Sequence, residues 1–123
     1  MSNPYETYHK YEVETLSKED TLIKVYEEIL SLLNITKMAI KEGDIKLKAN
    51  NIKKLTDAFN ILQASLDFEK GGEIAENLNQ LYQFCSKELM NAHLHNNIEN
   101  IDNVIKVLTP IYEGYKEAKD NLK

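Results

Sequence analysis

The residue types that can carry catalysis are few in this chain, and their spacing forms no familiar set. His93 and His95 are two positions apart, so on a helix their rings point in nearly opposite directions, and neither follows a glutamate by three positions as in a Glu-x-x-His metal motif. Cys85 has no histidine one turn away, and its place among apolar residues favours a small buried hydrophobe over a nucleophile. Gly71-Gly72 lacks the further glycines, lysine and preceding strand of a phosphate loop. We therefore predict no catalytic residue, no metal site and no cofactor.

Charge and composition exclude further classes of function. The 123 residues suit one domain, and hydrophobic and charged fractions of 42% and 28% are ordinary for a soluble helical protein. The formal net charge is −5, and all 15 basic residues are lysines, so the arginine fork that recognises phosphate and guanine is absent. Nucleic acid is not an expected partner. Neither a signal-peptide pattern nor an apolar run near the roughly 20 residues of a membrane span is present, which predicts a cytoplasmic protein without membrane insertion.

Apolar residues recur at helical spacing in four segments, approximately 18–42, 44–69, 73–95 and 98–122. Ser17 and Asp20 resemble a capping box, Gly43 and Asp44 suit a helix end and a new cap, and Asn96-Asn97 can cap the last segment. Four amphipathic helices with short connections predict an all-α fold, an antiparallel up-down four-helix bundle. The expected core positions are Leu22, Val25, Ile29, Leu32, Thr36 and Ala39, in a stripe that Tyr26, Leu33 and Ile40 widen; Ile52, Leu55, Phe59, Leu62 and Leu66; Ile74, Leu78, Leu81, Tyr82, Cys85, Leu89 and Ala92; and Ile98, Ile101, Ile105, Leu108, Tyr112, Tyr115 and Leu122.

Two places are expected to bend the chain. Gly71 and Gly72 can adopt positive φ without steric cost, which predicts the corner between the second and third helices at this pair. Pro110 lies inside the last segment, where it cannot bond the carbonyl of Lys106, so we expect a kink there. The alternative is that Thr109-Pro110 caps a restarted helix.

Two helices carry more apolar surface than one core-facing stripe requires. A second line on the second helix consists of Leu47, Ala58, Ile61 and Phe68, and a second flank on the fourth consists of Val104, Val107 and Ile111. Such a line either lies over a neighbouring helix or is an exposed strip that binds a partner. The residues alone leave both interpretations open. They also leave open two classes of function, a helical module that binds another protein's amphipathic segment and an enzyme whose site is assembled from scattered side chains.

The amino-terminal segment, residues 1–16, is predicted to be separate from the bundle domain of residues 17–123. Tyr5, Tyr8 and Tyr11 are spaced by three, which would place them on one face of a short helix that is too polar to be stable alone. This segment is either a disordered terminus or a mobile cap that docks its tyrosines on the bundle. Aromatic rings with a polar tip suit a surface that is covered only part of the time.

The exact residues of the central stretch are more informative than the spacing of its apolar positions. FEKGGEIAENLNQLY, residues 68–82, closely resembles the flagellar secretion chaperones of the FliS family. The resemblance extends along the chain, through Asn3, Tyr5, Tyr8, Leu22, Ile23, Tyr26, Glu27, Ala39, Gly43, Asp44, Leu89, Ala92, Tyr115 and Ala118. Two positions depart from the family pattern: Tyr115 stands where tryptophan is frequent, and Pro110 is not part of the pattern, which puts the family's straight last helix in doubt.

The resemblance implies an antiparallel bundle in the bacterial cytosol that binds flagellin and has no catalytic activity. Family members hold the disordered C-terminal segment of flagellin, prevent premature polymerisation and keep it competent for the flagellar type III export apparatus. An anti-sigma factor and a co-chaperone are further candidate partners that no residue here singles out. The expected flagellin-binding residues are those of the second apolar lines, Leu47, Ala58, Ile61, Phe68, Val104, Val107 and Ile111, with Tyr5 and Tyr8 covering part of that surface when flagellin is absent.

Overall fold

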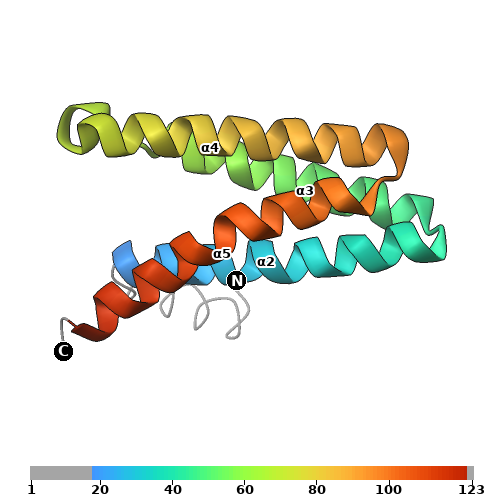
Figure 1. Cartoon of the computed structure of the whole chain (residues 1–123), viewed down its shortest axis with the longest axis horizontal. Coiled ribbons are helices and arrows are strands. Elements are labelled where there is room, and N and C mark those ends of the chain that lie inside the picture. Colours follow the sequence, from blue (N-terminus) through green and yellow to red (C-terminus); the bar gives the residue numbers. More distant parts are fainter. Residues whose placement is uncertain (1–17, 122–123) are drawn as a thin grey trace, which may run out of the picture.

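A computed structural model of the chain describes residues 18–121, and these form four helices joined by short turns (Figure 1). The helices are α2 (Lys18–Glu42), α3 (Ile45–Ala64), α4 (Phe68–His95) and α5 (Ile98–Asn121). Successive helices run in opposite directions, and α2 and α4 each pack on both α3 and α5. The predicted antiparallel up-down four-helix bundle is confirmed. The expected amino-terminal cap segment and Ser17 lie outside the described residues.

Two of the three corners, between α2 and α3 and between α4 and α5, lie where the sequence predicts them, and residues with left-handed φ or capping side chains form them. Gly43 adopts φ 72° after α2, and the backbone N–H of Asp44 donates to the carbonyl of Ala39 at 2.9 Å. The Asp44 carboxylate then accepts the backbone N–H of Leu47 at 3.1 Å and caps α3. At the next predicted corner, Asn96 adopts a left-handed φ of 52°, which ends α4.

The corner between α3 and α4 begins earlier than predicted. α3 ends at Ala64, and the carboxylate of Asp67 accepts the backbone N–H of Lys70 at 3.0 Å, which starts α4 at Phe68. Gly72 then interrupts α4 after its first turn with φ 49° and ψ −123°. The predicted two-glycine corner is therefore wrong as the end of the second helix, because the Asp67 cap starts a new helix before the glycines. Gly72 instead redirects that new helix.

The core contains the predicted main line of α3, namely Ile52, Leu55, Phe59 and Leu62, together with buried residues from the other three helices. Two predictions about burial are wrong. Ile74 is 70% exposed, because no other part of residues 18–121 covers the first turns of α4, and Val104 is 0% exposed, because it faces the centre of the bundle. In α2 the fully buried side chains are Tyr26 and Leu33, from one flank of the predicted stripe, and Thr36 from its main line.

α5 continues through Pro110 as one helix, and Figure 1 shows its second half turning away from α4 and running beside α2. Three contacts hold that half against α2. The hydroxyl of Tyr112 donates to Glu27 at 2.5 Å, and the ring of Tyr115 meets that of Tyr26 edge to face with centroids 5.6 Å apart. Nearer the end, Lys119 forms an ion pair with Asp20. Within the described helices, this half of α5 therefore leaves one side of the start of α4 uncovered.

Candidate apolar binding surface

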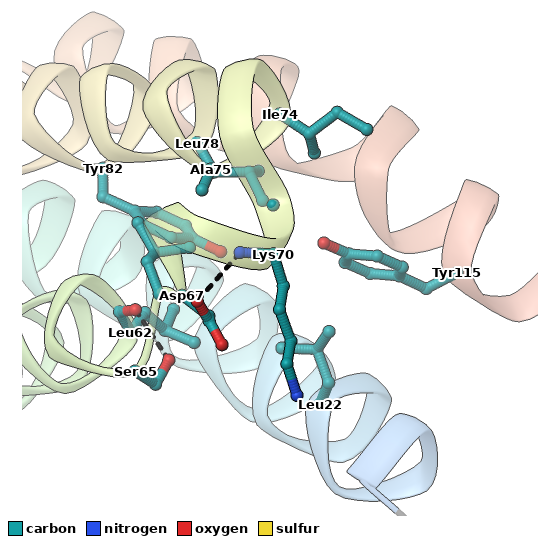
Figure 2. Close-up of a pocket in the computed structure, with 12 residues that line it drawn as sticks. Leu22, Leu62, Ser65, Asp67, Lys70, Ile74, Ala75, Leu78, Tyr82 and Tyr115 are labelled. Atoms are coloured by element: carbon teal, nitrogen blue, oxygen red, sulfur yellow. Dashed lines mark hydrogen bonds between the residues drawn. The ribbon is translucent and has the colours of Figure 1, made fainter.

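The divergence of α5 from α4 opens a pocket of about 370 Å³ at one end of the bundle (Figure 2). All four helices contribute to its walls. Its apolar lining consists of Leu22 from α2, Leu62 from α3, Leu66 from the following turn, Ile74, Ala75, Leu78 and Tyr82 from α4, and Tyr115 from α5. We call this hollow the α4–α5 pocket.

The floor of the α4–α5 pocket rests on a buried pair of tyrosines. The hydroxyls of Tyr26 and Tyr82 are 2.6 Å apart, and both side chains are almost completely inaccessible to water. Burial raises the pKa of Tyr82 to about 12 and that of Tyr26 further still. Burial also raises the pKa of the neighbouring Cys85 thiol to about 12. These groups stay protonated at neutral pH, so they form a neutral floor and do not act as acids, bases or nucleophiles there.

A second hollow surface runs between α2 and α3. Three hollows of about 560, 230 and 450 Å³ follow one another along this α2–α3 groove. Val25 lines both the first and the second hollow, and Leu32 and Lys54 line both the second and the third. The shared residues make the three hollows one groove. Its first hollow is bordered by Ile61 and its second by Ala58.

The α4–α5 pocket and the α2–α3 groove meet at the end of the bundle. Leu22, Leu62 and Ser65 line both the pocket and the first hollow of the groove. Ser65 is small, and its hydroxyl donates to the carbonyl of Leu62 at 2.8 Å, so it places no free hydrogen-bonding hydrogen in the path. A ligand chain can therefore pass from one face of the bundle to another while it stays in contact with apolar side chains.

The structure places the predicted site residues in different surroundings. Ile61, 68% exposed, and the half-buried Ala58 border the α2–α3 groove, while Leu47 and Phe68, 49% exposed, lie on the surface outside the hollows described above. Val104 belongs to the core, which corrects its assignment to an exposed strip.

Val107 and Ile111 are partly buried against the core. They lie on α5, and α3 and α5 are diagonal in the bundle, so the two predicted lines do not form one surface. Tyr5 and Tyr8 lie outside the described residues.

Several lining residues were assigned to the core by sequence reasoning. Leu22, Leu78 and Tyr115 keep core spacing but also face the α4–α5 pocket, and the exposed Ile74 lies at its edge. Asp67 is a typical helix-capping residue. Had the sequence prediction used it as the cap, the corner would have been placed before the two glycines and Ile74 near the start of the helix. No comparable pattern in the sequence indicates that α5 leaves α4.

The buried Lys48 has a structural role. Lys48 is buried, and its ammonium donates to the carbonyl of His93 at 3.2 Å and to the side chain of Asn96 at 2.7 Å, which fixes the end of α4 on the start of α3. Within residues 18–121, no three His, Cys, Asp or Glu side chains are grouped so that they could hold a metal ion. None of the four described helices is long and apolar enough to cross a membrane.

Comparison with known proteins decides the family. The family model described as "Flagellar protein FliS" matches residues 1–122. The chain belongs to the FliS family. This confirms the resemblance found in the sequence, and it places the chain among flagellar secretion chaperones, which are not a family of enzymes.

Individual FliS relatives support the assignment. The flagellar secretion chaperone FliS of Campylobacter jejuni is 33% identical over 117 residues, which cover 95% of this chain and 91% of the relative. The Salmonella typhimurium FliS is 32% identical over 106 residues, 85% of this chain and 78% of the relative. A crystal structure described as a flagellar chaperone from bacteria has a TM-score of 0.81 and covers 97% of this chain and 99% of its own at 18% identity, which supports the fold.

Proposed function

We propose that this FliS-family chain is a cytosolic export chaperone that binds the disordered C-terminal segment of flagellin. Binding prevents premature polymerisation and keeps flagellin competent for the flagellar type III export apparatus, without catalysing a reaction. One observation carries the proposal. In a member of a flagellar chaperone family, the α4–α5 pocket and the α2–α3 groove form one apolar surface around the end of the bundle.

The shape of this surface suits a disordered client better than a folded one. A flexible segment can follow the surface from one face of the bundle to the other, whereas a rigid partner would contact only one face. Ordering the segment costs free energy that offsets much of the contact energy, so binding over a large apolar area stays reversible. Reversibility is required of a chaperone that must release its client for export.

The structure changes which residues we assign to the client. Ala58 and Ile61 are kept, since they border the groove, and Leu22, Ile74 and Tyr115 are added from the pocket. Val104 is withdrawn because it is buried in the core. Leu47, Phe68, Val107 and Ile111 remain proposed contacts at the margins of the surface.

The amino-terminal segment is proposed to compete with flagellin. It joins α2 at Lys18, which lines the first hollow of the α2–α3 groove, so Tyr5 and Tyr8 are tethered beside the proposed client surface. A tether of this kind raises the local concentration of the tyrosines without new contacts. The export apparatus is proposed to act on the loaded complex, and an anti-sigma factor or co-chaperone stays a further partner without assigned residues.

Titration with a peptide from the last ~40 residues of flagellin, enough for several helical turns, tests the proposal. We expect a gain of helix by circular dichroism and a negative heat-capacity change by calorimetry, since apolar surface is buried as the peptide folds. Absence of binding at tens of micromolar would contradict the proposal.

Paired variants of the chaperone test where the peptide binds. Ile61→Glu with Phe68→Glu should abolish binding and leave the fold intact, because both side chains are exposed. Met90→Glu with Leu94→Glu is the matched control, since these residues of α4 are 63% and 64% exposed and line neither hollow surface. Equal losses in the two double variants would contradict the assigned surface.

A further inference from the structure

The α4–α5 pocket contains two hydrogen-bond donors that have no partner among residues 18–121. The ammonium of Lys70 makes no ion pair or hydrogen bond there, although the backbone N–H of the same residue bonds the Asp67 carboxylate at 3.0 Å. The hydroxyl of Tyr115 likewise makes no hydrogen bond, and its ring only contacts that of Tyr26. Lys70 is exposed and Tyr115 is half-buried, so both donors are accessible to a ligand that enters the pocket.

Figure 2 shows how the two donors lie. The Lys70 side chain extends from the first turn of α4 across the pocket toward Leu22, and the Tyr115 ring enters from α5 with its hydroxyl leading. Burial raises the pKa of Tyr115, so this hydroxyl stays protonated and can donate. Among the described lining residues, Asp67 is the one carboxylate, and one of its oxygens caps α4. An incoming anion would therefore meet two donors and the negative charge of Asp67, which the backbone N–H does not neutralise.

The pocket is closed at its inner end. Ala75 and Tyr82, 3% and 2% exposed, form the floor, so a chain that arrives from the α2–α3 groove cannot pass deeper into the core. Its volume of about 370 Å³ accommodates one large side chain with its backbone groups. The walls are mainly apolar, and the two donors lie on them. This arrangement suits an apolar side chain that carries a carboxylate only a few bonds away.

We propose that the α4–α5 pocket binds the C-terminal residue of the client, with its apolar side chain in the pocket and its main-chain carboxylate held by the Lys70 ammonium and the Tyr115 hydroxyl. A C-terminal residue presents both groups from one position. An internal Asp or Glu supplies the carboxylate but no apolar side chain. The inference rests on the proposed function, because a C-terminal flagellin segment ends in such a carboxylate.

Two peptides test the proposal on the full-length protein, one with the natural C-terminal carboxylate and one with a C-terminal amide. The amide has nearly the same shape and lacks the charge, so we expect it to bind about five- to tenfold more weakly, as for loss of a charge-assisted hydrogen bond. Lys70→Met keeps the apolar stem of the side chain. In this variant most of the preference for the acid peptide should be lost, and only the smaller part that the Tyr115 hydroxyl supplies should remain.

Two further variants make the result specific. Tyr115→Phe removes only the hydroxyl, and it should reduce the preference for the acid peptide without abolishing binding. Lys87→Met is the matched control, because Lys87 is an exposed lysine on the same helix that does not line the pocket. It should preserve the full difference between the two peptides.

The outcomes separate this inference from the proposed function. If neither peptide binds, the proposed function fails. If both bind equally to the unchanged protein, the function stands and the inference is overturned. If Lys70→Met weakens acid and amide peptides by the same factor, Lys70 contributes packing or general attraction, and recognition of the carboxylate is again overturned.

Discussion

The hydroxyl pair of Tyr26 and Tyr82 is a polar contact placed inside an apolar core. The two oxygens are 2.6 Å apart between α2 and α4, which are diagonal in the bundle, so one hydrogen bond joins helices that are not neighbours. Removing one hydroxyl leaves the other buried without a partner, which is costly, whereas removing both leaves an apolar contact. This asymmetry gives a prediction.

Tyr26→Phe and Tyr82→Phe are each expected to lower the free energy of unfolding by about 1–3 kcal/mol, since each leaves one buried hydroxyl unsatisfied. The double variant should be more stable than either single variant. Urea denaturation of all four proteins measures the coupling directly. Tyr115→Phe is the control, because its hydroxyl has no partner in the described chain, and its effect should be small. A double variant whose loss equals the sum of the single losses would contradict the paired arrangement.

Residue types alone predicted some of these environments. The prediction that Cys85 is a buried hydrophobe is confirmed, because its neighbours in the helical pattern are apolar on the same side. Val104 could not be placed correctly. Both Val104 and Ile105 lie on the wide apolar stripe of α5, and only the angle at which α2 and α4 cross that helix decides which of them is fully covered.

At the scale of the helices, two glycines have opposite roles. Gly72 holds φ 49° and redirects α4, while Gly114 lies inside α5 with open space around its Cα. Gly72→Ala is expected to lower the free energy of unfolding by about 1–2 kcal/mol, since L residues are strained at that φ. Gly114→Ala should raise it by about 0.5–1 kcal/mol, because alanine loses less conformational freedom in a helix.

Thermal and urea unfolding of the two glycine variants check these signs together, and each variant is the control for the other. If Gly72→Ala were as stabilising as Gly114→Ala, α4 would be continuous at this position in solution. Gly71→Ala gives a further comparison, since an added Cβ would lie 2.9 Å from that of Ala75, so close that one of them must shift.

The helices themselves could be predicted from the sequence, but one corner could not be placed. The ends at Gly43 and Asn96-Asn97 follow from left-handed and capping residues at the edges of apolar patterns. Between α3 and α4, however, two local preferences compete within six residues: a capping aspartate at Asp67 and a flexible pair at Gly71-Gly72. The cap starts the helix, because its carboxylate satisfies a backbone N–H that would otherwise lack a partner.

At the scale of the whole molecule, the binding surface depends on how α5 is positioned. Tyr112, Tyr115 and Lys119 hold its second half on α2, and this opens the α4–α5 pocket. Each of these contacts joins residues at least 85 positions apart, and no local sequence pattern indicates them. Sequence reasoning therefore found apolar residues in excess of a core, but it could not find where the excess forms a surface.

A surface that covers two faces of the bundle predicts that different parts of one client occupy them. The two halves of the flagellin peptide should each bind alone, and the whole peptide should bind about 10²–10⁴-fold more tightly than either half, since linkage makes the second contact intramolecular. Ile61→Glu, in the α2–α3 groove, should weaken one half at least tenfold, and Ile74→Glu, at the α4–α5 pocket, should weaken the other, because each change buries a charge under one half only. Met90→Glu should weaken neither. Fluorescence anisotropy of labelled half-peptides measures all of these affinities. If one variant weakened both halves, or if the whole peptide bound no more tightly than its better half, the client would occupy a single face, and the continuous surface would not be the binding path.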